Sequence, residues 1–123
     1  MLVKILNLDG VPDSDGQVFA PEGVTVPAEV PVKLGFGSSE KIGTAKLVRT
    51  EKAVYAELKL DREVSHDMVP AIGGVAHQFS FGGDVMTIEK SSIEEIGLSE
   101  SKNSDPRILS LREQIRMAVI LPL

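Results

Sequence analysis

Short runs of apolar and β-branched residues, broken by glycine, proline and aspartate, make up most of this chain. The clearest run is at residues 53–60, where Val54, Ala56, Leu58 and Leu60 alternate with more polar residues. A period of two places every second side chain on the same face of an extended strand. The pattern predicts a mainly β (α+β) domain in which these four side chains form one buried stripe.

Turn-forming residues divide the rest of the chain into further segments. Strands are predicted at residues 2–8, 44–50, 75–81, 84–89 and 92–98. Only Glu51 and Lys52 separate the second of these strands from the run at 53–60, which predicts a hairpin. Residues 20–32 contain three prolines and are predicted to form a loop or a sheet edge, because proline cannot donate a ladder hydrogen bond. Residues 61–74 are compatible with a short helix of one or two turns.

One longer helix is predicted near the C-terminus, at about residues 105–117. Ser104 or Asp105 is the expected N-cap, and Pro106 suits the first helical position because its missing N–H is not needed there. Three aliphatic residues are spaced for one buried face: Ile108, Leu111 and Ile115.

Composition excludes several functional classes. The 123 residues are enough for one domain with its own core, predicted to span residues 1–123. The formal net charge is −5 and the basic residues are dispersed, which argues against nucleic-acid binding. The chain has no cysteine, which removes thiol catalysis, zinc–cysteine sites and disulfides. No apolar run approaches the roughly 20 residues of a membrane helix, and the N-terminal run does not resemble a signal peptide. We expect a soluble domain with no membrane or nucleic-acid partner.

Residues 75–85 (VAHQFSFGGDV) carry a histidine and a serine three positions apart, the residue types of a base and a nucleophile. In a regular strand, His77 shares a face with Phe79 and Phe81, whereas Ser80 points to the other face. At about 3.3 Å per residue, His77 and Ser80 lie roughly 10 Å apart along the chain. Regular alternation therefore predicts that His77 is a structural residue beside the phenylalanines and not a base for Ser80.

Four stretches resemble, in chain order, the tailed-phage prohead (head maturation) protease family: VFAPEGVTVPAEVPVKL, KIGTAKLVRTEKAVYAELKLD, GGVAHQFSFGGDV and SIEEIGLSESKNSDPRI. The resemblance covers roughly residues 5–110 through short motifs. It implies a small antiparallel β-barrel with one or two packed helices, similar to the herpesvirus assemblin proteases. Carried over by position, Ser80 falls on the family's nucleophilic serine, and Glu100 falls within its leucine-x-glutamate-serine segment.

The chain departs from this family at the catalytic base. The family's histidine lies in the loop before the isoleucine-glycine strand, and that loop, residues 33–43, contains no histidine here. His66 lies beyond the following hairpin, where the family does not place its base. A serine hydroxyl without a base is a poor nucleophile at neutral pH. No catalytic residues are therefore expected; in an active protease, Ser80 would be the nucleophile, His66 the base and Glu100 the orienting group.

A protease-like domain without its base is expected to be a virion structural protein. Such a pseudoenzyme would act as a capsid decoration or cement protein, or as an accessory head protein. Its expected partners are the major capsid protein or other head proteins, and a homo-oligomer remains an open option. It would be made in the host cytoplasm and carried in the virion. The alternatives are a divergent serine-type head maturation protease and a non-viral binding domain on the same barrel.

One loop matches part of a calcium-binding pattern. Asp13, Asp15 and Glu22 fall at positions 3, 5 and 12 of an EF-hand loop, with Gly16 at position 6. However, valine occupies position 1, and neighbouring prolines prevent the flanking helices. An ordinary Asp/Gly turn is the favoured interpretation, with no metal and no cofactor.

The last segment, residues 117–123, is hydrophobic except for Pro122. Leaving each large aliphatic side chain exposed costs about 1.5–3 kcal/mol relative to burial, so this segment is expected to be covered. Two arrangements are open. The segment closes the domain's own barrel as a final strand, or it extends as an arm that pairs with the sheet edge of a neighbouring subunit.

Overall fold

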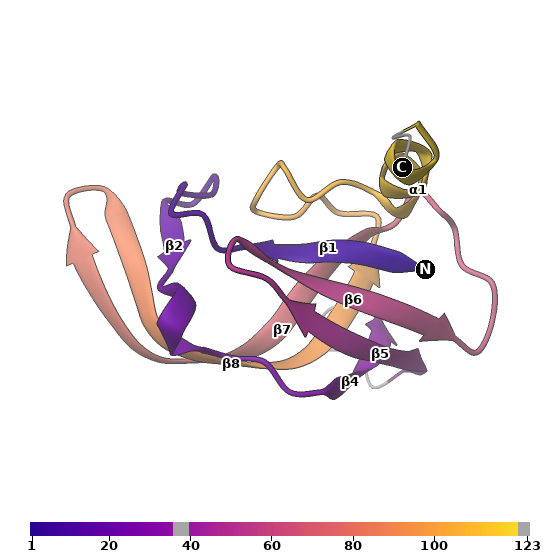
Figure 1. Cartoon of the computed structure of the whole chain (residues 1–123), viewed down its shortest axis with the longest axis horizontal. Helices are drawn as coiled ribbons and strands as arrows, with labels where there is room; N and C mark the ends of the chain where they lie inside the picture. The colour runs from indigo at the N-terminus through magenta and orange to yellow at the C-terminus, as the bar shows by residue number, and fades with distance from the viewer. Residues whose placement is uncertain (36–39, 121–123) are drawn as a thin grey trace.

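The protein is mainly β, as predicted, and its strands form one mixed sheet that curls into a half barrel (Figure 1). The computed structural model describes residues 1–35 and 40–120. Its elements are β1 (Leu2–Asn7), β2 (Gln17–Phe19), the 3₁₀ turn η1 (Pro21–Gly23), β3 (Val24–Thr25), β4 (Glu29–Leu34), β5 (Lys41–Arg49), β6 (Ala53–Leu60), β7 (Val69–Gly82), β8 (Val85–Ser99) and α1 (Leu111–Ile120).

The resemblance implied an antiparallel sheet, but the observed sheet is mixed. The strand order is β1-β6-β5-β4-β8-β2, with β3 and β7 also paired to β8. Along the path β1-β6-β5-β4, each strand is antiparallel to the next, and β7 is antiparallel to β8. In contrast, β2, β3 and β4 all run parallel to β8. Parallel neighbours need a long crossover connection, and here the chain passes through β5, β6 and β7 between β4 and β8. Residues 17–34 therefore lie along one edge of β8, while β7 lies along the other.

The core lies on the concave side of the sheet. The predicted stripe on β6 is confirmed: Val54, Ala56 and Leu58 are buried, and Leu60 is half-buried against the same core. The predicted hairpin between β5 and β6 is also confirmed. The Thr50 hydroxyl organises its turn, because Oγ1 accepts a hydrogen bond from the Ala53 amide at 3.1 Å.

The proline-rich segment forms a turn and an edge strand up to Thr25, as predicted, but its last part, β4, does not lie at a sheet edge. Residues 21–25 form a 3₁₀ turn and a two-residue strand, and β4 lies between β5 and β8 inside the sheet. Pro31 is paired with Thr44 of β5 but precedes the first β4–β8 pair, Val32 with Ile96. One side of β4 is thus without a ladder partner at Pro31, which is where a missing amide is tolerated.

The strands predicted at 84–89 and 92–98 are one continuous strand, β8, which pairs with β7 in a long hairpin. Its two-residue turn is Gly83–Asp84, in which Gly83 has a φ of +62° and Asp84 does not have a positive φ. Glycine at the first central position is the pattern of a type II′ turn, whose twist matches that of the strands. The outer part of this hairpin extends away from the body of the molecule, to the left in Figure 1.

The helix starts later than predicted. Residues 104–108 form a separate turn, closed by the bond from the Ile108 amide to the Asp105 carbonyl, and α1 begins at Leu111. Its cap is Ser110, whose hydroxyl bonds to the Glu113 amide at 3.2 Å and to the Glu113 carboxylate at 3.3 Å. This is close to the serine-x-x-glutamate capping box. Leu111 is fully buried, as expected of the helix face.

Two other predictions near this helix were wrong. Residues 61–68 contain turns and no helix, so α1 is the single α-helix of the described residues. The C-terminal segment is not a strand at residues 117–120, because α1 continues to Ile120. Residues 121–123 of that segment lie outside the described part of the chain.

Helix α1 packs against the free edge of β1. The Gln114 side chain uses both of its polar atoms there: Oε1 accepts from the Lys4 amide at 2.7 Å, and Nε2 donates to the Lys4 carbonyl at 3.0 Å. This amide therefore pairs with the edge backbone in the way that a neighbouring strand does. At the helix start, the Leu111 and Arg112 amides donate to carbonyls of the β6–β7 loop, at Met68 and His66.

Candidate functional site

Ser80, the position that resembles a nucleophile, lies in the outer half of β7 near the hairpin turn. Its side chain is exposed, and its hydroxyl donates a hydrogen bond of 2.6 Å to Oε1 of Glu89 on β8. Ser80 pairs with Thr87 across the hairpin. The hydroxyl is therefore held by a carboxylate and not by an imidazole.

His77 is not placed as strand alternation predicted. The β7–β8 register is irregular here: His77 has no direct partner on β8, and Glu89 has none on β7. The His77 ring lies 3.0 Å, Nε2 to Oγ, from Ser92, which follows the buried Ser91 and so points away from the core. A bulge of this kind interrupts alternation, so His77 does not lie beside Phe79, which pairs with a buried residue of β8. His77 and Ser80 therefore have different hydrogen-bond partners. The reason is the irregular register of β7 and β8, not the regular alternation on which the prediction rested.

The other two residues of the alternative protease assignment lie at the opposite end of the hairpin. His66 is in the β6–β7 loop (right in Figure 1), and Glu100 directly follows β8, whose last residue, Ser99, pairs with Val69 at the start of β7. The 14 residues of β7 span roughly 45 Å if fully extended, at about 3.3 Å per residue. The structure does not bring Ser80, His66 and Glu100 together.

The partial calcium pattern forms an aspartate turn. Oδ1 of Asp13 accepts the amides of Asp15 and Gln17, both at 2.9 Å, and Oδ2 accepts the Ser104 hydroxyl at 3.0 Å. Glu22 lies in η1, beyond β2, and does not join these carboxylates. Across residues 1–35 and 40–120, no three histidine, aspartate or glutamate side chains are grouped so that they could hold a metal ion.

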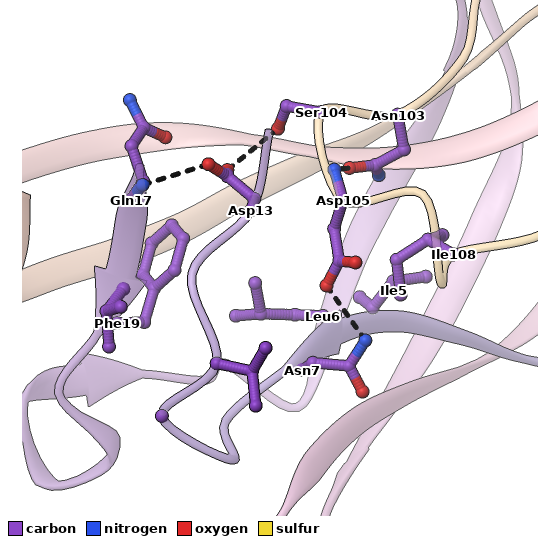
Figure 2. Close-up of a pocket in the computed structure, with 13 residues that line it drawn as sticks. Ile5, Leu6, Asn7, Asp13, Gln17, Phe19, Asn103, Ser104, Asp105 and Ile108 are labelled. Carbon is purple, nitrogen blue, oxygen red and sulfur yellow. Dashed lines mark hydrogen bonds between the residues drawn. The ribbon is translucent and has the colours of Figure 1, made fainter. Parts of the chain in front are cut away.

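A small, partly open space lies beside this turn, between the end of β1, β2 and the loop before α1 (Figure 2). Its volume is about 50 Å³, whereas an engineered cavity that holds benzene measures about 150 Å³. Its polar walls bond to one another: Asn7 Nδ2 donates to Asp105 Oδ2 at 2.9 Å, and the Asp105 amide donates to Asn103 Oδ1 at 2.9 Å. The space is too small for a substrate, and the Asn7, Asn103 and Asp105 side chains in its walls already bond to other protein groups.

An ion cluster seals the same end of the molecule. Arg107 Nη1 lies 2.5 Å from Asp9 Oδ2, and Nη2 lies 3.1 Å from Asp105 Oδ2. The hydrogen bond from Arg107 lowers the pKa of Asp9. Burial acts to raise the pKa of Asp105, but the hydrogen bonds from Arg107 and Asn7 outweigh it, so that this pKa is also lowered. These bonds tie the loop after β1 to the loop before α1.

The feature of this structure that sequence reasoning missed is the exposed outer half of the hairpin. Phe79 is 53% exposed and Phe81 is 72% exposed, and their rings meet edge to face with centroids 5.9 Å apart. Sequence alternation predicted only that these phenylalanines share one face of the strand, not that they are exposed. The available signal was the glycine content of residues 73–83, since glycines weaken a strand interior and mark departures from regular pairing.

Comparison of this chain with protein-family models, with curated proteins and with solved structures finds no match. Within the described residues, no helix has the length and hydrophobicity needed to span a membrane.

Proposed function

We propose that this chain is a virion structural protein of a tailed phage. In this proposal it is a prohead-protease-like barrel domain, similar to the herpesvirus assemblins, that has lost proteolysis and acts as a capsid decoration, cement or accessory head protein. It is made in the host cytoplasm and carried in the virion, where it contacts the major capsid protein or other head proteins. The family assignment rests on the sequence resemblance.

The observation that carries the proposal is the environment of Ser80. Its hydroxyl bonds to Glu89, and a carboxylate is a weaker base than the imidazole that activates serine in hydrolases. Of the chain's two histidines, His77 contacts Ser92, and His66 is at the other end of β7. A sequence that resembles a protease, in a structure where no base is assembled beside the serine, supports a binding role over catalysis.

A serine-reactive phosphonate probe tests the loss of activity. The purified protein is expected to remain unlabelled, like its Ser80→Ala variant, because no base raises the nucleophilicity of the hydroxyl. An active serine protease treated in parallel confirms that the probe is competent. Stoichiometric labelling that Ser80→Ala abolishes would favour the alternative, a divergent head maturation protease.

A further inference from the structure

The outer half of β7, residues 74–82, is an open sheet edge, and its register with β8 is irregular around His77 and regular from Phe79 to Gly82. Among the described residues, β8 is the only strand that pairs with β7. Residues 74–82 contain no lysine, arginine, aspartate, glutamate or proline. Natural edge strands commonly carry such residues, which discourage pairing with another chain. This edge instead presents an uncharged strand that can accept a further strand.

One face of this hairpin is apolar and continues the core. Phe79 pairs with Ile88 on β8, and Ile88 pairs in turn with Phe19 on β2, which packs against the core. Directly paired residues lie on the same face of a sheet, so the row runs from the core outwards to Phe79. Phe81, two positions further, is the most exposed large hydrophobic side chain in the described residues. The core face of the sheet is therefore left uncovered at the hairpin.

We propose that two copies of this chain associate by antiparallel pairing of their β7 edges at residues 78–82. A two-fold axis perpendicular to the sheet keeps the phenylalanines of both copies on the same face. With Ser80 on this axis, Phe79 of each copy lies opposite Phe81 of the other, and the four rings form one aromatic cluster. The hairpins join into a sheet in the order β8-β7-β7-β8. This inference comes from the hairpin alone and does not rest on the virion role.

The uncharged edge and the exposed phenylalanine pair favour a second copy as the occupant, against the repulsion that net charge produces elsewhere. Each chain carries a formal net charge of −5, so that two copies repel each other over most of their surfaces. The β7 edge has no charged residue and is the place where two copies meet without like charges in direct opposition. A basic partner would find no acidic residue on this edge to recognise. A two-fold interface needs only one self-complementary patch, which the exposed phenylalanine pair supplies.

The exposed area of the two phenylalanines sets the expected stability of the dimer. An aromatic side chain buries about 150–250 Å² when covered, so at 53% and 72% exposure Phe79 and Phe81 offer roughly 250 Å² in each copy. A dimer would cover roughly 500 Å² from these rings alone, whereas a standard stable interface buries about 1,600 Å² in total. The remainder must come from the strand backbone and flanking side chains. We therefore expect a reversible dimer that depends on protein concentration.

Analytical ultracentrifugation of the purified chain, from about 1 μM to about 1 mM, tests the proposal. The wild type is expected to pass from monomer to dimer in this range. Raising the salt concentration should strengthen the dimer, because salt screens the repulsion between two acidic copies. Phe81→Lys should weaken the dimer at least about 30-fold, the effect of losing an aromatic hot spot.

Val48→Lys is the matched control, because Val48 is 51% exposed on β5, away from the hairpin. It should leave the dimer unchanged. Amide hydrogen exchange of the wild type gives a second readout that needs no variant: protection of residues 78–82 should rise with protein concentration. A wild type that stays monomeric throughout, equal effects of the two lysine variants, or exchange of residues 78–82 that is independent of concentration would each overturn the proposal. A monomer whose hairpin binds a different protein would do so as well.

Discussion

Leu58→Ala is the sharpest test of which face of β6 forms the core. Leu58 is 6% exposed and pairs with the buried Ala45 of β5. Its amide donates to the Met1 carbonyl at 2.8 Å, and alanine keeps that bond. The substitution therefore removes side-chain packing and leaves the backbone of the strand intact.

The magnitude follows from the atoms that are lost. Leucine to alanine removes three carbons, and each buried methylene contributes about 0.8 kcal/mol, which gives about 2.4 kcal/mol. A residual cavity adds to this, because a close-packed core relaxes only in part. We expect the free energy of unfolding to fall by about 3 kcal/mol. With an unfolding entropy of about 2.1 cal/mol/K per residue over 123 residues, this lowers the melting temperature by about 12 °C.

The assay is thermal and urea unfolding followed by circular dichroism, with Lys59→Ala as control. Lys59 is the next residue on the same strand and is exposed on the opposite face. Its loss should change the free energy of unfolding by no more than about 0.5 kcal/mol. If Leu58→Ala and Lys59→Ala melted at the same temperature, the assignment of the buried face would be refuted.

Two further substitutions test the ion cluster around Arg107 and the contact between α1 and the edge of β1. Asp105→Asn should lower the free energy of unfolding by about 1 kcal/mol at pH 7, since it weakens the hydrogen bonds that Asp105 accepts from Arg107 and Asn7. Because the folded pKa of Asp105 is lowered, its contribution is present above the unfolded value of about 3.9 and is lost as the pH falls through the folded pKa. The difference between wild type and variant in urea unfolding should therefore shrink below about pH 4, and a difference independent of pH would contradict this. Gln114→Ala should cost about 1–2 kcal/mol in the same assay, because it leaves both backbone groups of Lys4 without their partner. Arg116→Ala, at an exposed position of the same helix, should have little effect on the free energy of unfolding. If Gln114→Ala and Arg116→Ala lowered it equally, the role of Gln114 in holding α1 against β1 would be contradicted.

The parts of the fold that could be predicted are those governed by local periodicity. The run at residues 53–60 alternates without interruption and lies inside the sheet, so its pattern and its burial agree. The helix was found but misplaced, because Asp105 and Pro106 look like a helix start. They form a separate turn in which Arg107 binds Asp105 and Asp9, a partner distant in sequence. The local signal for the true start is Ser110 followed by Glu113, a weaker pattern than the aspartate-proline pair that precedes it.

The candidate site was predicted less well, because it depends on pairing between strands. Alternation assumes a regular ladder, but His77 and Glu89 lie where the β7–β8 register is irregular, and no composition rule locates such a bulge. The parallel pairing of residues 17–34 with β8 depends on contacts far apart in sequence. Exposure of Phe79 and Phe81 follows from the hairpin extending beyond the sheet, whereas a hydrophobic pattern predicts burial.

Quantitative mass spectrometry of purified mature heads tests the virion role most directly. The measurement compares the copy number of this chain with that of the major capsid protein in the phage that encodes it. A decoration or cement protein is expected at a fixed ratio commensurate with the capsid lattice, in full-length form, and also in particles that carry Ser80→Ala. A chain nearly absent from mature heads, together with head proteins that remain uncleaved in the Ser80→Ala phage, would contradict the account and identify a maturation protease.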